Sequence, residues 1–179
     1  MKTRELWDWL WDVPVDGPKA TLLLRVMAGS VFLWEGVLKF IFVTQGVGRF
    51  TKLGFPFPGE TAHFVAVVEI VGGLMLLTGL CSRLIALVFI GEMAVAMLST
   101  KITMFLGTSP LALPPVAPQT GFWAVLHEIR SEYAQMFVSL YVMLEGPGRL
   151  SLDAWLKRRS VSRPALRRSA ALLETVGRG

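Results

Sequence analysis

Apolar residues gather in four long stretches along the chain, separated by short polar or proline-rich segments. At about 1.5 Å per residue, a helix of roughly 20 residues covers the ~30 Å hydrocarbon core of a membrane. The segment 81–83 is long enough only for a turn, and Gly146-Pro147-Gly148 ends the last stretch. The pattern therefore predicts an all-α, integral membrane four-helix bundle with spans at about residues 20–43, 62–80, 84–104 and 124–144.

The first 18 residues combine four acidic residues with three tryptophans, unlike the basic start and apolar core of a cleaved signal peptide. Apolar side chains recur on one helical face of this segment, at Leu6, Trp7, Leu10 and Trp11. Because tryptophan favours the boundary between membrane and water, residues 1–18 are expected to hold a short interfacial helix ending near Pro14. A frayed terminus is the alternative.

The amino-acid composition excludes an ordinary soluble fold. Hydrophobic residues make up 53% of the 179 residues, charged residues make up 17%, and the mean hydropathy is +0.55. An average soluble domain has roughly 25% charged residues. The length fits a single domain, which is assigned to residues 19–156.

Positive charge is concentrated behind the last apolar stretch. Of the 18 Lys and Arg residues, which outnumber the 13 Asp and Glu residues, eight follow residue 146. Residues 157–179 are therefore interpreted as a basic cytoplasmic tail that faces anionic lipid, and nucleic acid is not an expected partner. Since an even number of spans puts both termini on one side, both termini are predicted to be cytoplasmic.

The few cysteine and histidine residues of the chain limit which cofactors and metals it could bind. Its single cysteine, Cys81, excludes an internal disulfide, a CxxC redox pair and a cysteine-based zinc site. Redox chemistry would therefore depend on a borrowed cofactor. His63 and His127 begin the second and fourth spans and could ligate a haem iron from opposite sides, but neither lies deep in its helix. Haem is disfavoured for this reason, and no metal site is expected.

The two outer loops, residues 45–61 and 105–123, are apolar and rich in proline. Proline fixes φ and removes a backbone donor, so these loops are expected to be stiff. They could cover an opening in the bundle as a lid, but a plain connector is the favoured interpretation.

Charged and polar residues interrupt each apolar stretch, although a charge at the membrane centre costs about 2.5–3.5 kcal/mol. Helical spacing places these residues on one face of each span, and the predicted topology places them in the outer half of the membrane. Lys39 is expected to pair with Glu35 four residues before it, and Glu69 is expected in the outer third of its span. The candidate pocket consists of Glu35, Lys39, Glu69, Glu92, Glu132 and Gln135.

Three further residues are weaker candidates for this pocket. Trp34 is expected to wall it at the adjacent level, and Lys101 and Arg130 would add positive charge. Because both cations lie on helical faces turned away from the glutamates, snorkelling to the outer surface is their alternative. For the whole set, the alternative to a pocket is a polar network that fixes helix register.

Glycines repeat at intervals of seven residues in the first two spans, at Gly29 and Gly36 and at Gly72 and Gly79. Small residues at such positions let helix backbones approach closely in membranes. We expect these glycines to mark helix contacts and to carry no chemistry.

Three motifs stand out along the chain, VEIVGG at 68–73, GLCSRL at 79–84 and GPGRLSLD at 146–153. With these motifs, about residues 20–156 resemble the DoxX family of small four-helix bacterial membrane proteins. Residues 99–102 and 130–132 further resemble a branch related to the DoxD-type subunit of thiosulfate:quinone oxidoreductase. The resemblance implies a bacterial inner-membrane protein, and it links members to quinone-coupled sulfur oxidation and to oxidative-stress complexes.

The leading functional hypothesis is a membrane subunit of an electron-transfer or oxidative-stress complex, with a pocket for a quinone or another small molecule in the outer half of the bundle. Its expected partners are the lipid bilayer and soluble or membrane-bound redox proteins. Any enzymatic role would be that of a non-catalytic or quinone-linked subunit of an oxidoreductase. The alternatives are a transporter for a small solute or protons, and an assembly or scaffold subunit without chemistry of its own.

Overall fold

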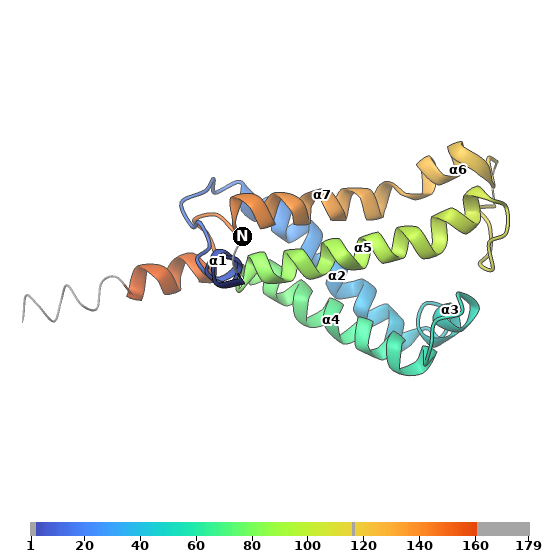
Figure 1. Cartoon of the computed structure of the whole chain (residues 1–179), viewed down its shortest axis with the longest axis horizontal. Helices are drawn as coiled ribbons and strands as arrows, with labels where there is room; N and C mark the ends of the chain where they lie inside the picture. The colour runs from blue at the N-terminus through green and yellow to red at the C-terminus, as the bar shows by residue number, and fades with distance from the viewer. Residues whose placement is uncertain (1–2, 116, 161–179) are drawn as a thin grey trace, which may run out of the picture.

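The computed structural model describes residues 3–115 and 117–160, and this part of the chain is helical without strands (Figure 1). Residues 152–160 are also helical. The basic tail expected from residue 157 lies outside the described residues beyond residue 160. The helices in chain order are α1 (Thr3–Trp11), α2 (Thr21–Ile41), α3 (Val47–Lys52), α4 (Pro58–Thr78), α5 (Ser82–Phe105), α6 (Gly121–Glu128) and α7 (Arg130–Glu145).

Three of the described helices, α2, α4 and α5, are long and apolar enough to cross a membrane. They correspond to the first three predicted spans, and their bounds differ from the predicted ones by four residues at most. The largest difference is at the start of α4, which begins at Pro58. Proline suits the first turn of a helix because its fixed φ is helical and its missing N–H would have no partner there.

The fourth predicted span, residues 124–144, is not one continuous helix. It folds as α6 and α7, which are separated at Ile129. At this break the Lys101 ammonium donates a hydrogen bond to the Glu128 carbonyl, at 3.1 Å between Nζ and O. A side chain that binds a backbone carbonyl in this way interrupts the helical hydrogen-bond ladder, which is a recognised cause of kinks.

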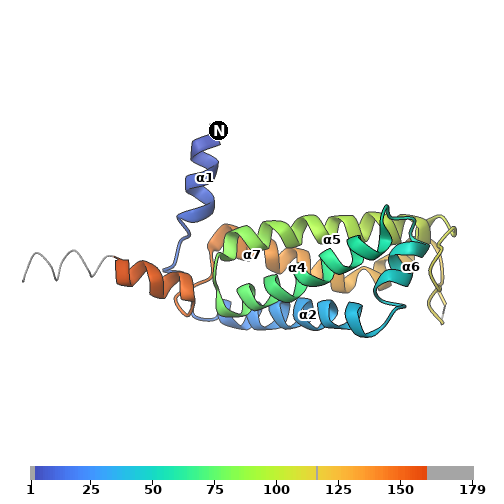
Figure 2. The same ribbon diagram turned by 90° about the horizontal axis from the view of Figure 1, so that it is seen from below.

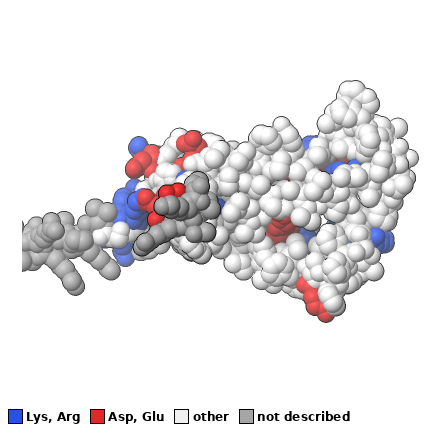
Figure 3. All heavy atoms as spheres, in the orientation of Figure 1, with Lys and Arg blue, Asp and Glu red and all other residues white. Residues whose placement is uncertain are grey.

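The helices are arranged as two pairs, with α2 packed along α4 and α5 packed along α7 (Figures 1 and 2). The pairs lie close together where α1 and residues 152–160 are found, which we call the terminal end. They separate toward α3 and α6, which we call the loop end (Figure 1). Charged atoms gather at the terminal end, whereas most of the flank seen in Figure 3 is uncharged.

The α2–α4 contact depends on glycine. A Cβ atom at Gly29 would lie 2.9 Å from the Gly73 carbonyl oxygen, and one at Gly36 would lie 2.7 Å from the Ala66 carbonyl oxygen. Gly72 faces α5 instead, where the side chains of Ile85 and Phe89 leave no room for a Cβ. The prediction of close contacts is therefore confirmed for Gly29, Gly36 and Gly72.

Gly79 has a different role, because it turns the chain between α4 and α5. Its φ of +70° lies in the left-handed region that glycine tolerates best. A Cβ there would also lie 2.5 Å from the Ser151 Cβ and 2.7 Å from the Arg25 Cζ. The turn is thus packed against the first span and the segment after α7.

Arg25 joins three parts of the terminal end through backbone carbonyls. Its guanidinium is fully buried and donates to Leu76 and Leu77 at the end of α4 and to Pro147 and Leu150 after α7, at 2.7–2.9 Å. The last carbonyls of a helix have no partner within the helix, so a buried cation there satisfies and complements them. Arg25 therefore stabilises the fold and lies far from the candidate pocket.

Arg83 and Asp153 complete this arrangement. Arg83 donates to the Met143 and Leu144 carbonyls at the end of α7 and to the Trp9 carbonyl, and it lies 4.1 Å from the centre of the Trp9 ring. Asp153 accepts hydrogen bonds from the Cys81 and Ser82 amides at the start of α5, at 2.9 and 3.1 Å. The motifs at 79–84 and 146–153 thus tie helix ends together.

Candidate functional site

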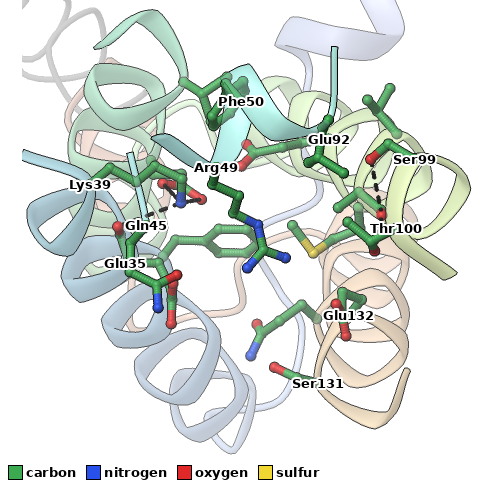
Figure 4. A pocket seen from close by; sticks show the side chains of 18 of the residues that line it. Glu35, Lys39, Gln45, Arg49, Phe50, Glu92, Ser99, Thr100, Ser131 and Glu132 are labelled. Atoms are coloured by element: carbon green, nitrogen blue, oxygen red, sulfur yellow. Dashed lines mark hydrogen bonds and ion pairs between the residues drawn. The ribbon is translucent and has the colours of Figure 1, made fainter. Parts of the chain in front are cut away.

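A cavity of about 640 Å³ lies between the two helix pairs, in the half of the bundle toward the loop end. Side chains from α2 through α7 line it, and Arg49 of α3 points into it (Figure 4). It contains seven of the nine candidate residues, namely Glu35, Lys39, Glu69, Glu92, Lys101, Glu132 and Gln135. Helical spacing had placed them on separate polar stripes, and the fold brings these stripes to one cavity.

Lys39 forms an ion pair with Glu69 of α4, at 2.6 and 2.8 Å from Nζ to the two carboxylate oxygens. The expected pair with Glu35 is wrong, since Lys39 reaches only the Glu35 backbone carbonyl, at 3.5 Å. The reason is the close approach of the helices at Gly36, where an added Cβ would lie 3.0 Å from the Glu69 Cβ. This approach brings a counter-ion from α4 within reach of Lys39.

Glu92 of α5 lines the cavity beside this pair, close enough for its carboxyl to interact with that of Glu69. Two carboxyl groups in such contact are favourable when they share a proton, and together with the Lys39 ammonium they then carry no net charge. Glu69 lies near the middle of α4 and not in the outer third, because α4 begins at Pro58. Both glutamates are therefore at the middle of their helices.

Lys101 forms the second ion pair of the cavity, 3.0 Å from Oε1 of Glu132 on α7. Its side chain is buried, so the snorkelling alternative does not hold for it. Lys101 and Glu92 lie on opposite faces of the same helix, so helical spacing alone predicted no partner for Lys101. Its partner comes from the neighbouring helix, and the α6–α7 break supplies the Glu128 carbonyl as a second acceptor.

Two charged groups point into the cavity without a hydrogen-bonding or ionic partner among the described residues. They are the Arg49 guanidinium from α3 and the Glu35 carboxylate from α2 (Figure 4). In addition, the buried Oε1 of Gln135, which lines the cavity, has no hydrogen-bond partner within the described chain. Since buried polar atoms are nearly always hydrogen-bonded, the cavity suits a molecule with polar groups of its own.

The loop over residues 45–57 closes part of the cavity, which differs from the favoured interpretation of a plain connector. Gln45, Arg49, Phe50, Leu53 and Phe55 all line the cavity. Phe50 is buried, and its ring lies 5.2 Å from that of Phe55. Arg49 was not among the predicted pocket residues, although an arginine inside an apolar outer loop is a usable signal.

Trp34 and Arg130 do not line the cavity, so their selection is wrong. Trp34 is 52% exposed on the outside of α2. Arg130 is exposed and contacts the His127 ring at 2.8 and 2.9 Å. His63 stacks on Phe40 at 5.4 Å between ring centres, also outside the cavity lining. No group of three or more potential metal ligands occurs in the described part of the chain.

Comparisons with known proteins agree with the resemblance in the sequence. A family model described as DoxX matches residues 20–102. An uncharacterized membrane protein, Rv3486 of Mycobacterium tuberculosis, is 33% identical over 153 residues, which are 82% of this chain and 87% of that protein. A Bacillus subtilis protein named "Putative oxidoreductase CatD" is 26% identical over 136 residues, covering 76% of this chain and 86% of that protein. No solved structure matches the chain.

Proposed function

We propose that this chain, which belongs to the DoxX family of membrane proteins, binds a quinone headgroup in its cavity as the membrane subunit of an electron-transfer or oxidative-stress complex. The oxidoreductase name of the Bacillus subtilis relative supports this direction. A bacterial inner membrane is the proposed location. We also propose that the chain is related to the DoxD-type subunit of thiosulfate:quinone oxidoreductase.

The observation that carries the proposal is the set of unpaired polar groups inside a cavity that has both polar and apolar walls. Its volume lies within the usual range for small-molecule sites, roughly 300–1,000 Å³. A quinone has two carbonyl oxygens on a flat ring, and the Arg49 guanidinium and the Gln135 amide offer donors for them. Phe32 and Met93 provide apolar wall for the ring. The residues present therefore fit this group.

The chain's own residues would hold the headgroup and exchange protons with it. A bound quinone supplies the capacity to accept two electrons and two protons. Glu69 and Glu92 lie at the cavity wall in contact with each other, so they are placed to hold and release a proton beside the ligand. The electrons would come from a partner redox protein, because a single cysteine provides no internal dithiol couple.

The topology proposed with this function has four spans, with α6 and α7 together as the fourth and both termini in the cytoplasm. The α6–α7 unit covers residues 121–145, and α7 packs along α5. In α1, Trp7 and Trp11 are exposed and their rings stack at 6.1 Å. Such paired indoles suit the membrane interface, where α1 would lie flat.

The test measures binding of a benzoquinone with a ten-carbon tail to the purified full chain in lipid nanodiscs. Arg49→Gln is expected to weaken binding about tenfold or more, since a hydrogen bond to a charged group contributes roughly 1.5–3 kcal/mol. The matched control is Lys52→Gln, in the same helix but outside the cavity lining, and it should bind normally. Equal affinities of both variants would contradict the proposal. Solute transport by the chain alone in liposomes would favour the transporter alternative.

A further inference from the structure

The cavity has an opening in the side of the bundle, between α4 and α5. These helices touch at Gly72, whose backbone lies against Ile85 and Phe89, and they separate from there toward the loop end (Figure 1). In the separated part, Phe64 of α4 and Val95 of α5 line the cavity and are 70% and 51% exposed. Such exposed side chains at the edge of the cavity, where the two helices have separated, mark an opening.

The wall around this opening is apolar. Val67 and Val71 on α4 and Val88 and Leu98 on α5 are exposed. Both helices are long and apolar enough to span a membrane, so these side chains face lipid. In Figure 3, acidic and basic atoms are visible at the middle of this mostly uncharged flank. The polar interior of the cavity is thus reached from the acyl-chain region of the bilayer.

The loop end offers a poorer entrance. Here Phe50 of α3 lines the cavity (Figure 4) and packs against Phe55, which lines the cavity as well. Phe50 is buried, so a molecule arriving from the water would have to displace this aromatic pair. A molecule dissolved in the bilayer meets the opening between α4 and α5 without such a displacement.

We infer that the ligand of this cavity is an amphipathic, lipid-soluble molecule that enters between α4 and α5 and keeps its apolar tail in this opening. The inference rests on the proposed function and narrows its ligand to a headgroup carrying a hydrocarbon or isoprenoid tail. The head contacts the polar groups of the cavity, whereas the tail lies against Phe64 and Val95. Such a placement leaves the tail in apolar surroundings throughout binding.

The first experiment tests the opening without any ligand. Dicyclohexylcarbodiimide dissolves in lipid and adds the O–H of a protonated carboxyl across one of its C=N bonds. Migration of the acyl group to nitrogen then leaves a stable N-acylurea, with no atom lost. In full-length protein in nanodiscs, mass spectrometry should find this adduct on Glu92 or Glu69, and a water-soluble cationic carbodiimide should label them much more slowly.

Val95→Trp should suppress this labelling, because the larger side chain fills the opening. Leu87→Trp is the matched control, since Leu87 is exposed on the same helix at the level where α4 and α5 touch and does not line the cavity, and its labelling should be unchanged. Equal rates for the two reagents, or normal labelling of Val95→Trp, would place the entrance at the loop end and overturn the inference.

The second experiment tests the tail, with one benzoquinone carrying a ten-carbon tail and the same ring carrying only a methyl group. Val95→Trp should weaken binding of the tailed compound by roughly tenfold and leave the methyl compound unaffected, because only the tail competes with the new indole. An equal effect on both compounds, or on neither, overturns the inference about the tail. If neither compound binds the unmodified chain, the proposed function fails, whereas the carbodiimide labelling still decides whether the opening exists.

Discussion

Lys39 of α2 and Glu69 of α4 form an ion pair, so the effect on stability of substituting one residue depends on whether the other is present. Removing one member leaves a charge in an apolar setting, which costs roughly 3–5 kcal/mol, whereas replacing both by apolar groups is often nearly neutral. Lys39→Met is therefore expected to lower the melting temperature of the purified protein strongly. The double variant Lys39→Met/Glu69→Met should recover most of this loss in the same thermal unfolding assay. A double variant that melts lower than Lys39→Met alone would rule out this coupling.

Helical spacing was sufficient to bring seven of the nine selected residues to the cavity, but not to pair them. The face on which a residue lies depends only on its position in its own helix, and Glu35, Lys39 and Gln135, which were selected by spacing, line the cavity. Trp34 precedes Glu35 by one residue, which rotates it about 100° away from the cavity. The partner of Lys39 depends on the distance between α2 and α4, which no single stretch of sequence contains.

Cys81 lies at the junction of α4 and α5, next to the Asp153 carboxylate that accepts its backbone amide. Burial, and secondarily the negative charge of Asp153, raise the pKa of the Cys81 thiol above its ordinary value. Less thiolate is present at a given pH, so alkylation by iodoacetamide should reach half its maximal rate at higher pH than in the SDS-unfolded chain. Asp153→Asn keeps an acceptor for the helix start and should move this midpoint to lower pH. An unchanged midpoint in Asp153→Asn would contradict the role of its charge.

At the scale of helices, the contact between α4 and α5 depends on the absence of a side chain at Gly72. A leucine there would overlap Ile85 and Phe89, and overpacking of this kind costs roughly 1–3 kcal/mol. Gly72→Leu should therefore reduce the yield of folded protein and its melting temperature. Gly91→Leu is the matched control, because nothing lies within 4 Å of a Cβ at Gly91. Comparable losses in both variants would argue against a specific helix contact.

The helices themselves were predictable where length and hydrophobicity decide their formation. For α2, α4 and α5, the apolar stretches gave the bounds to within four residues. The division into α6 and α7 was missed because it depends on Lys101, which lies 27 residues before the Glu128 carbonyl that it binds. The same holds for α3, a helix of six residues whose place over the cavity follows from tertiary contacts.

At the scale of the whole molecule, the proposed orientation can be tested at the carboxyl terminus. Lysine and arginine remain on the cytoplasmic side of a membrane, and eight of the 18 follow residue 146. A fluorescent or enzymatic reporter fused after Gly179 should be active in the cytoplasm. A phosphatase that functions only in the periplasm should be inactive at the same position. The opposite result would reverse the orientation and place the cavity on the cytoplasmic side.

The position of Glu69 and Glu92 at the middle of their helices has an electrical consequence. A charge that moves to this depth crosses about half of the transmembrane field, so a potential of about 100 mV changes its binding free energy by roughly 1 kcal/mol. The change in binding free energy has the same size for a charge that enters from either side of the membrane, but the opposite sign. Occupancy of the cavity by an ion, or by a ligand that takes up a proton from one side, is therefore expected to depend on voltage, whereas binding of a neutral molecule is not.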